Sequence, residues 1–214
     1  MSKVSSKEIL LQTPKGEVRI RPFCTAEEIR RCKFDTEFRI YPHFRSLYIK
    51  RESLEKPAGQ PGANVVLATA DQRLIIGFGV LAYPDAGERW TALGPGMMME
   101  VKAIEVVRSR RSAGIAHGLM RMILSHPQIE DKIIYMIGYS WTWDLEGTQK
   151  TVQEYRRMLV ELFGSYGFQE FQTNEPNICL KPENIFMGRI GENISQDLQT
   201  QFKWLRFGIS PIRI

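Results

Sequence analysis

The chain has 214 residues, of which 43% are hydrophobic, 25% charged and 10% aromatic, and its formal net charge is +5. This composition excludes disordered and fibrous proteins and predicts a globular protein with a full hydrophobic core. The longest apolar stretch, residues 74–83, is about half of the roughly 20 residues that a membrane-spanning helix needs. The N-terminus lacks the hydrophobic segment of a secretory signal, so we expect a soluble, cytoplasmic protein.

Cysteine and histidine usage points away from disulfides and metals. Cys24, Cys32 and Cys179 form an odd set with no CxxC pair, which predicts a reducing compartment and no disulfide framework. The three histidines show no metal-ligand spacing, so we expect no metal. The positive charge allows an anionic partner such as nucleic acid, an acidic protein face or a polyphosphate cofactor.

The first quarter of the chain contains one predicted strand and one predicted helix. Residues 1–14 are polar and poorly patterned, which predicts a flexible N-terminus. Residues 17–22 alternate charged and apolar side chains, as a half-buried strand does. Thr25-Ala-Glu-Glu28 is a capping box and predicts a helix to about Phe38. Residues 51–63 contain two prolines and two glycines, which predicts a flexible surface loop.

The middle of the chain alternates between β-rich and helical patterns. Residues 64–69 and 74–83 predict a β-hairpin, and a third apolar run covers residues 97–107. Apolar residues recur at helical spacing over residues 114–124, and Pro127 ends that helix.

The last third continues this alternation. We expect strands at residues 132–139, 168–172 and 185–190, and helices at residues 148–163 and 195–206. The order of elements predicts one α/β domain with a mixed sheet over residues 15–214.

One segment suggests chemistry: a strand that leads through a basic turn into a helix. Arg108, Arg110 and Arg111 form the turn, and the small residues Ser112-Ala-Gly114-Ile-Ala116 open the helix. A helix N-terminus presents unpaired N–H groups and a partial positive charge, which suit a phosphate. Small residues let a ligand approach the backbone closely, and the arginines add countercharge. The segment therefore predicts a pyrophosphate-binding turn.

The common phosphate-loop signatures do not account for this segment. Neither G-x-x-x-x-G-K-[ST] nor a G-x-G-x-x-G that follows a first strand occurs in the sequence. An ordinary glycine-containing helix start remains an alternative. A basic nucleic-acid patch would interleave aromatic residues with the arginines, and this turn has none, so we expect no nucleic-acid partner.

These residues resemble the GCN5-related N-acetyltransferase (GNAT) superfamily. Arg111-Ser-Ala-Gly114-Ile-Ala116 fits its R/Q-x-x-G-x-G/A signature, placed between a strand and a helix. The resemblance implies acetyl-CoA as cosubstrate, with the Ser112 to Ala116 backbone (Ala113 and Ile115 included) on the pyrophosphate and the Ile104 and Val106 backbone on the pantetheine. It also implies a mixed, mostly antiparallel sheet with helices on both faces and a splayed strand pair where coenzyme A enters.

A closer resemblance, to the acetoin-utilisation branch of this superfamily, covers most of the chain. It is carried by short phrases at residues 88–90, 103–106, 143–145, 154–156 and 189–191. It implies a protein lysine acetyltransferase that modifies and inactivates acetyl-CoA synthetase. Two alternatives stay open: acetylation of a small amine, and a non-catalytic protein that senses coenzyme A and regulates a partner.

Acetyl transfer to lysine requires a base, because the free amine has a pKa near 10.4 and is almost fully protonated at pH 7. The candidates are Glu100 and Glu105, which are five residues apart and face opposite sides of a regular strand, so only one can face the cleft unless a bulge intervenes. The resemblance ranks Glu100 first, by its distance from Gly114. The alternative for each is a salt bridge, to Lys102 or to Arg108.

The resemblance also raises the question of a general acid, since the superfamily often has a tyrosine where this chain has Phe163. A thiolate is a good leaving group, so no acid needs to be present.

An aromatic segment at residues 139–144 follows a predicted strand. Trp143 and Asp144 could form a substrate-lysine channel, with aromatic walls around the alkyl stem and a carboxylate for the ammonium. The alternative is an aromatic sheet edge that packs on the following helix.

Overall fold

The computed structural model describes residues 8–41, 44, 46, 48–71 and 73–209 of the chain. The chain divides into two compact units, the first made of Met1–Ala82 and Lys102–His126 and the second of Tyr83–Val101 and Pro127–Ile214. Strand β6 (Met98–Val106) contributes residues to both units. The single domain predicted for residues 15–214 stays a prediction.

The first unit contains an antiparallel sheet. Its strands before β6 are β1 (Ile9–Thr13), β2 (Gly16–Arg21), β3 (Lys33–Phe34), β4 (Asn64–Ala70) and β5 (Leu74–Ala82). β1 pairs with β2, β2 with β4 and β4 with β5, all antiparallel, which confirms the predicted β4–β5 hairpin. β1 was not predicted, because its alternation lies inside a stretch whose polar composition indicated a flexible N-terminus.

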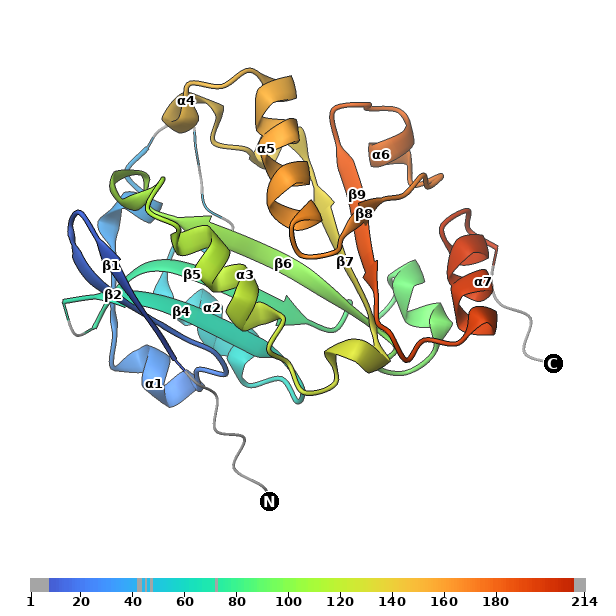
Figure 1. Ribbon diagram of the computed structural model, residues 1–214, viewed down its shortest axis with the longest axis horizontal. Helices are drawn as coiled ribbons and strands as arrows, with labels where there is room; N and C mark the ends of the chain where they lie inside the picture. The colour runs from blue at the N-terminus through green and yellow to red at the C-terminus, as the bar shows by residue number, and fades with distance from the viewer. Residues whose placement is uncertain (1–7, 42–43, 45, 47, 72, 210–214) are drawn as a thin grey trace. The chain divides into compact units, whose positions relative to one another are not determined.

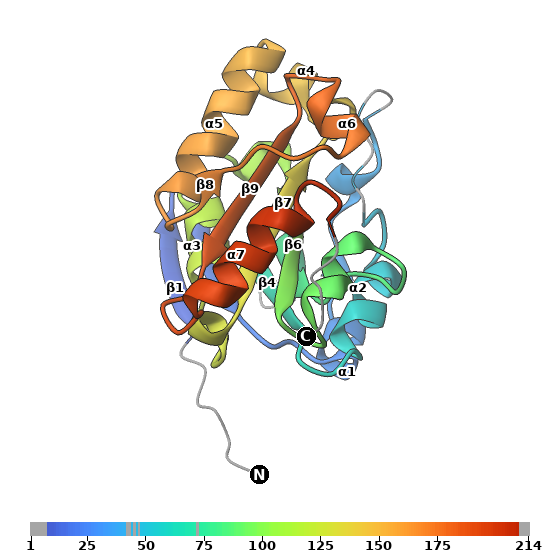
Figure 2. The same ribbon diagram turned by 90° about the vertical axis from the view of Figure 1, so that its right-hand side faces the viewer.

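Helices cover both faces of this sheet. They are α1 (Ala26–Arg30), α2 (Arg51–Ala58) and α3 (Ile115–Ile123). Figure 2 shows α3 on one side of the strands and α1 and α2 on the other. α3 approaches the sheet closely because two glycines leave room: a Cβ on Gly118 would overlap Ile20 of β2, and one on Gly79 would contact Ile123.

The predicted helix from Thr25 to Phe38 is wrong beyond its first turns. The capping box forms, but α1 ends at Arg30. β3 then pairs parallel with β5, and a 3-10 turn follows at Thr36–Phe38. The Phe34 and Phe38 rings lie 6.1 and 5.1 Å from the ring of Phe78, so burial of two aromatics on the sheet outweighs continuation of the helix.

The loop predicted at residues 51–63 is also wrong, because its first half is α2. Leu54 and Pro57 are buried, so the segment has an apolar face that the proline and glycine content concealed. Glu55 accepts a hydrogen bond from Arg30 Nε at 2.8 Å, which ties α2 to the end of α1. Gly59 ends the helix.

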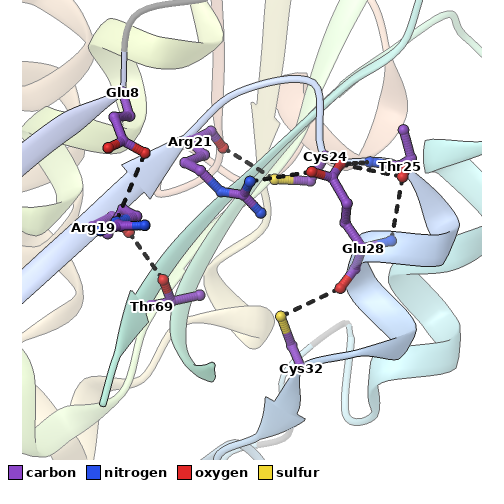
Figure 3. A network of polar contacts seen from close by, with 8 residues as sticks. All are labelled: Glu8, Arg19, Arg21, Cys24, Thr25, Glu28, Cys32 and Thr69. Carbon is purple, nitrogen blue, oxygen red and sulfur yellow. Dashed lines mark hydrogen bonds and ion pairs between the residues drawn. The ribbon is translucent and has the colours of Figure 1, made fainter. Parts of the chain in front are cut away.

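A polar network joins β2 to α1 (Figure 3). Arg21 donates to Glu28 Oε1 at 3.1 Å, and the Glu28 and Thr25 side chains cap each other's backbone. The thiols of Cys24 and Cys32 donate to the Arg21 and Glu28 carbonyls at 3.3 and 3.4 Å. Burial raises the pKa of the Cys24 thiol to about 12, so this thiol serves packing rather than reaction.

In the second unit, the start of β6 is followed by β7 (Ile133–Gly138), β8 (Gln169–Glu170) and β9 (Ile185–Ile190). Met98–Glu100 pair parallel with Ile133–Tyr135, while β7 with β9 and β8 with β9 are antiparallel. Most of the described strand pairs are antiparallel, which confirms the predicted mixed, mostly antiparallel sheet. The predicted splaying of β6 from β7 beyond Glu100 involves residues of both units and stays a prediction.

Helices also cover both faces of the second unit's strands. They are α4 (Leu145–Thr148), α5 (Val152–Gly164), α6 (Pro176–Cys179) and α7 (Gln196–Leu205). Figure 1 shows α5 on one side of β7 and β9 and α7 on the other. The α7 face has a core that includes Trp90, Tyr135, Phe186 and Phe202.

Helix ends in this unit follow their capping residues. The helix predicted at 148–163 starts later, at Val152, because Thr151 and Glu154 form a capping box there. α7 confirms the predicted final helix, with Ser195 as its N-cap and Arg206 as its C-cap. Within the described residues, none of the helices combines the length and apolar character that crossing a bilayer requires.

Candidate active site

The predicted pyrophosphate turn lies between β6 and α3 in the first unit. A 3-10 turn at Arg108–Arg110 follows the strand, and the backbone then passes through left-handed conformations at Ser112 (φ 61°) and Gly114 (φ 77°). Gly114 is the N-cap of α3 and supplies no capping side chain. Since the first N–H groups of a helix have no acceptor within the helix, α3 presents them at this turn.

Two arginines fix the shape of the turn. Arg111 Nε donates to the Val106 carbonyl oxygen at 3.0 Å, so its guanidinium spans the turn from the helix start back to the strand end. Arg110 donates to the carbonyl oxygen of Lys15, in the β1–β2 hairpin, at 2.6 Å. Arg111 therefore orders the backbone as well as adding positive charge, a role that the sequence did not indicate.

A carboxylate from a distant segment also supports the turn. Glu37 Oε2 accepts hydrogen bonds from the Ser109 backbone N–H and from the Tyr41 hydroxyl, both at 3.0 Å. The Arg108 guanidinium lies 3.6 Å from the centre of the Tyr41 ring. Burial alone would raise the pKa of Glu37, but the hydrogen bonds from Ser109 and Tyr41 outweigh it and hold this pKa below its usual value. Sequence reasoning missed Glu37 and Tyr41.

The geometry of the turn fits a pyrophosphate. An uncapped helix start, arginine side chains and small residues supply N–H donors, positive charge and room. A Cβ built on Gly114 has only Leu11 within 4 Å, at 3.9 Å, so the helix start is open on the protein side. The residues present thus fit a diphosphate group.

The two candidate bases differ in their surroundings. Glu100 pairs in register with Tyr135 of β7, so these two side chains share a face of the sheet. Glu105 belongs to the first unit, where its carbonyl oxygen lies 3.0 Å from the position of a Cβ on Gly77. In a regular strand, side chains five residues apart point in opposite directions, so a regular β6 would let only one of these two carboxylates face a given side of the sheet.

Glu100 shares its surroundings with a second carboxylate that no sequence pattern singled out. The buried Tyr135 hydroxyl donates to Glu88 Oε2 at 3.3 Å, and the Tyr135 ring lies 5.3 Å from that of Trp90. Burial raises the pKa of Tyr135, and the charges of Glu100 and Glu88 raise it further. The only signal for Glu88 in the sequence was its place in a phrase of the family resemblance.

Trp143 lies on the opposite face of β7, and Asp144 follows it at the start of α4. Trp143 is 9% exposed, stacks on Tyr155 of α5 at 5.2 Å, and lies against Gly138 on the face opposite to Tyr135. Asp144 is 1% exposed, and its Oδ1 accepts from the Gly147 N–H at 3.0 Å as the N-cap of α4. Both side chains make these packing contacts within the second unit, and the substrate-lysine channel expected of them stays a prediction.

Metal ligands do not gather in the described part of the chain: it contains no group of three or more histidine, cysteine, aspartate or glutamate side chains placed to hold a metal ion.

A strand that runs through an arginine turn into a glycine-started helix, in a mixed and mostly antiparallel sheet, is the arrangement that the sequence resemblance to the GNAT superfamily implies. No protein-family model matches the sequence. The chain is 35% identical over 197 residues to the acetoin utilization protein AcuA of Bacillus licheniformis, which covers 92% of both chains. It is 36% identical over 164 residues to AcuA of Bacillus subtilis strain 168, covering 77% of this chain and 78% of that one. The protein therefore belongs to the AcuA family.

A solved structure supports this assignment. The crystal structure of an acetoin utilization protein from Exiguobacterium sibiricum 255-15 matches with a TM-score of 0.87 and 27% identity, over 97% of each chain.

Proposed function

We propose that this protein transfers the acetyl group of acetyl-CoA to a lysine side chain of acetyl-CoA synthetase and thereby inactivates that enzyme. The uncapped, arginine-flanked start of α3 directly after β6 carries the cosubstrate part of the proposal. The protein substrate rests on membership in the AcuA family and on the resemblance seen in the sequence.

The first unit's turn would hold the cosubstrate. Backbone N–H groups from Ser112 to Ala116 would bind the pyrophosphate, and the Ile104 and Val106 backbone would bind the pantetheine. The bound cosubstrate supplies a thioester, whose acyl carbon accepts an amine. The Arg111 bond to Val106 would keep the strand end and the helix start at a fixed separation.

Glu100 is the proposed base. Its carboxylate would accept a proton from the substrate's lysine ammonium, directly or through water, because only the neutral amine attacks the acyl carbon. A C–N bond then forms, the C–S bond breaks, the electron pair leaves with the thiolate of coenzyme A, and the second proton of the attacking nitrogen passes to that thiolate through water. The residue at the expected acid position, Phe163, is buried and packs edge-on against Phe168 at 5.2 Å, and a thiolate can leave without an acid.

The test is intact-protein mass spectrometry of acetyl-CoA synthetase after incubation with this protein and acetyl-CoA. We expect one added acetyl group, mapped to one lysine and accompanied by loss of synthetase activity. A reaction without this protein is the control, since acetyl-CoA slowly acetylates lysines by itself. If no group is added although the protein binds acetyl-CoA, the protein substrate is wrong, and small amines and a sensing role are tested next.

A further inference from the structure

A stacked aromatic pair, half-buried Tyr139 and exposed Trp141, lies at the end of β7 in the second unit. The rings of Tyr139 and Trp141 stack with 4.6 Å between centroids and 12° between planes. Trp141 is 55% exposed, and Leu180, at the end of α6, is 77% exposed. We call Tyr139, Trp141 and Leu180 the aromatic platform. Large apolar side chains that remain this exposed are common where a protein binds a partner.

The platform is held in place by buried polar contacts. The side chain of Asn184, which is buried, accepts from the Ser140 N–H at 2.7 Å and donates to the Asn177 carbonyl of α6 at 2.5 Å. The Lys181 ammonium lies 4.8 Å from the centre of the Trp141 ring. Trp141 and the end of α6 are therefore fixed to each other, so binding would cost little ordering of the backbone.

Three half-buried carboxylates lie on or next to the elements that carry the platform: Glu175 at the start of α6, and Glu88 and Glu100 beside Tyr135, four residues before Tyr139. Glu100 lies beside Tyr135 in the sheet register, and Glu88 accepts the Tyr135 hydroxyl hydrogen bond. Glu175 is the N-cap of α6. Burial raises the pKa of the Tyr139 hydroxyl, and the charges of Glu175, Glu100 and Glu88, in that order, raise it further. Negative charge thus gathers beside an exposed apolar surface.

We propose that the aromatic platform binds the segment of the substrate protein that carries the acceptor lysine. An apolar side chain next to that lysine would pack on Trp141 and Leu180, while the ammonium would be drawn to the carboxylates of Glu88, Glu100 and Glu175. Charge complementarity selects this occupant, because a lysine-bearing segment supplies both the cation and the apolar contact. The inference rests on the proposed function and names the surface that recognises its protein substrate.

The test compares Trp141→Ala and Leu180→Asp with a matched control, Trp204→Ala. Trp204 lies on α7, is 47% exposed and also has a lysine ammonium over its ring, that of Lys203 at 5.5 Å. Steady-state kinetics with acetyl-CoA synthetase, and separately with the small probe Nα-acetyl-lysine methylamide, give KM and kcat for each variant. Thermal melting by circular dichroism checks that each variant is folded.

We expect both platform variants to raise the KM for acetyl-CoA synthetase about tenfold or more, as hot-spot truncations do. The KM for acetyl-CoA and the turnover of the small probe should stay within twofold of wild type, and Trp204→Ala should leave all values within twofold. If both platform variants behave like Trp204→Ala, or if they lose turnover of the small probe as well, the platform is not the docking surface, and the proposed function still stands. If the wild-type protein acetylates neither substrate, the proposed function fails and the inference fails with it.

Discussion

The turn before α3 and the Tyr135 face of the second unit are built in opposite ways. The turn is one continuous stretch, residues 106–116, whose donors are backbone N–H groups at a helix start. The Tyr135 face brings Glu88 and Glu100 from two separate segments to one buried tyrosine, and the charge of Glu175, from a third segment, acts on Tyr139. A site made of backbone can be inferred from a short motif, whereas a site made of side chains depends on which segments the fold brings together.

The largest effect on activity should come from removing the proposed base, Glu100, on the Tyr135 face. Glu100→Gln should lower kcat about 100-fold or more, because general base catalysis contributes roughly 10²–10⁴ in rate. The KM for acetyl-CoA should not change, since the turn is untouched. Stopped-time mass spectrometry of the acetylated product measures this. Glu105→Gln is the control and should stay within threefold; if it shows the larger loss, the assignment of the two carboxylates is reversed.

Alanine substitutions at two glycines, one in each unit, compare how tightly the backbone is packed in the two regions. A Cβ on Gly191 would overlap the backbone carbonyl of Glu130, whereas one on Gly118 would overlap only the end of the Ile20 side chain. Backbone cannot rotate away, so Gly191→Ala should destabilise the protein by about 3 kcal/mol and Gly118→Ala by about 1–2 kcal/mol. At this chain length the melting temperature should fall by roughly 2–4 °C for each kcal/mol. Differential scanning calorimetry would contradict this ranking if Gly118→Ala melted first.

The turn itself is tested by Gly114→Ala, with Gly167→Ala as the control. Both glycines have left-handed φ angles, 77° and 83°, and a new Cβ would meet no atom closer than 3.7 Å at either. Each change should therefore cost about 1–2 kcal/mol of stability through backbone strain. Only Gly114→Ala should raise the Kd for acetyl-CoA, by about tenfold, in isothermal titration calorimetry. Equal affinities in the two variants would remove the turn from the binding site.

The smallest effect should be on stability, from Glu37, the carboxylate that accepts a hydrogen bond from the turn at Ser109. The pKa of Glu37 is below its usual value in the folded state, so its charge stabilises the fold above that value and the contribution is lost as the pH falls through the lowered pKa. Glu37→Gln keeps an acceptor for Ser109 and Tyr41 but loses the charge. Urea unfolding should show the variant about 1 kcal/mol less stable at pH 7. The difference in unfolding free energy between wild type and variant should shrink as the pH falls below about 4.5, where the carboxylate becomes protonated. If the difference stayed constant down to about pH 3, the charge would play no part.

Secondary structure could be predicted where the pattern was local and failed where distant residues competed. The hairpin of β4 and β5, the strand β9 and the helices α3 and α7 were predicted because their periodicity and caps are complete in themselves. The helix expected to reach Phe38 failed because Phe34 and Phe38 gain more by packing on Phe78, which lies far along the chain in β5.

The neighbouring tryptophans show the same limit at the site. Trp141 and Trp143 belong to one aromatic segment, and nothing in the sequence says which of them is exposed. The fold buries Trp143 against Gly138 and Tyr155 and leaves Trp141 at the surface. Trp141 lies within the 3-10 turn Ser140–Thr142, and Trp143 follows that turn as its C-cap. A substrate channel at Trp143 stays a prediction, whereas the tryptophan that can meet a partner at the surface is Trp141.

The family of the protein could be inferred from the sequence alone, and a candidate phosphate-binding turn could be predicted from it, because a phosphate site at a helix start needs only a contiguous backbone, small residues and nearby arginines. Features that depend on pairing between distant segments came only with the fold. The fold placed Glu100 beside Tyr135, brought Glu88 to the same hydroxyl, and turned Trp143 to the other face. Strand register sets which side chains share a face. Register is the alignment of two paired strands, so it cannot be read from either strand by itself.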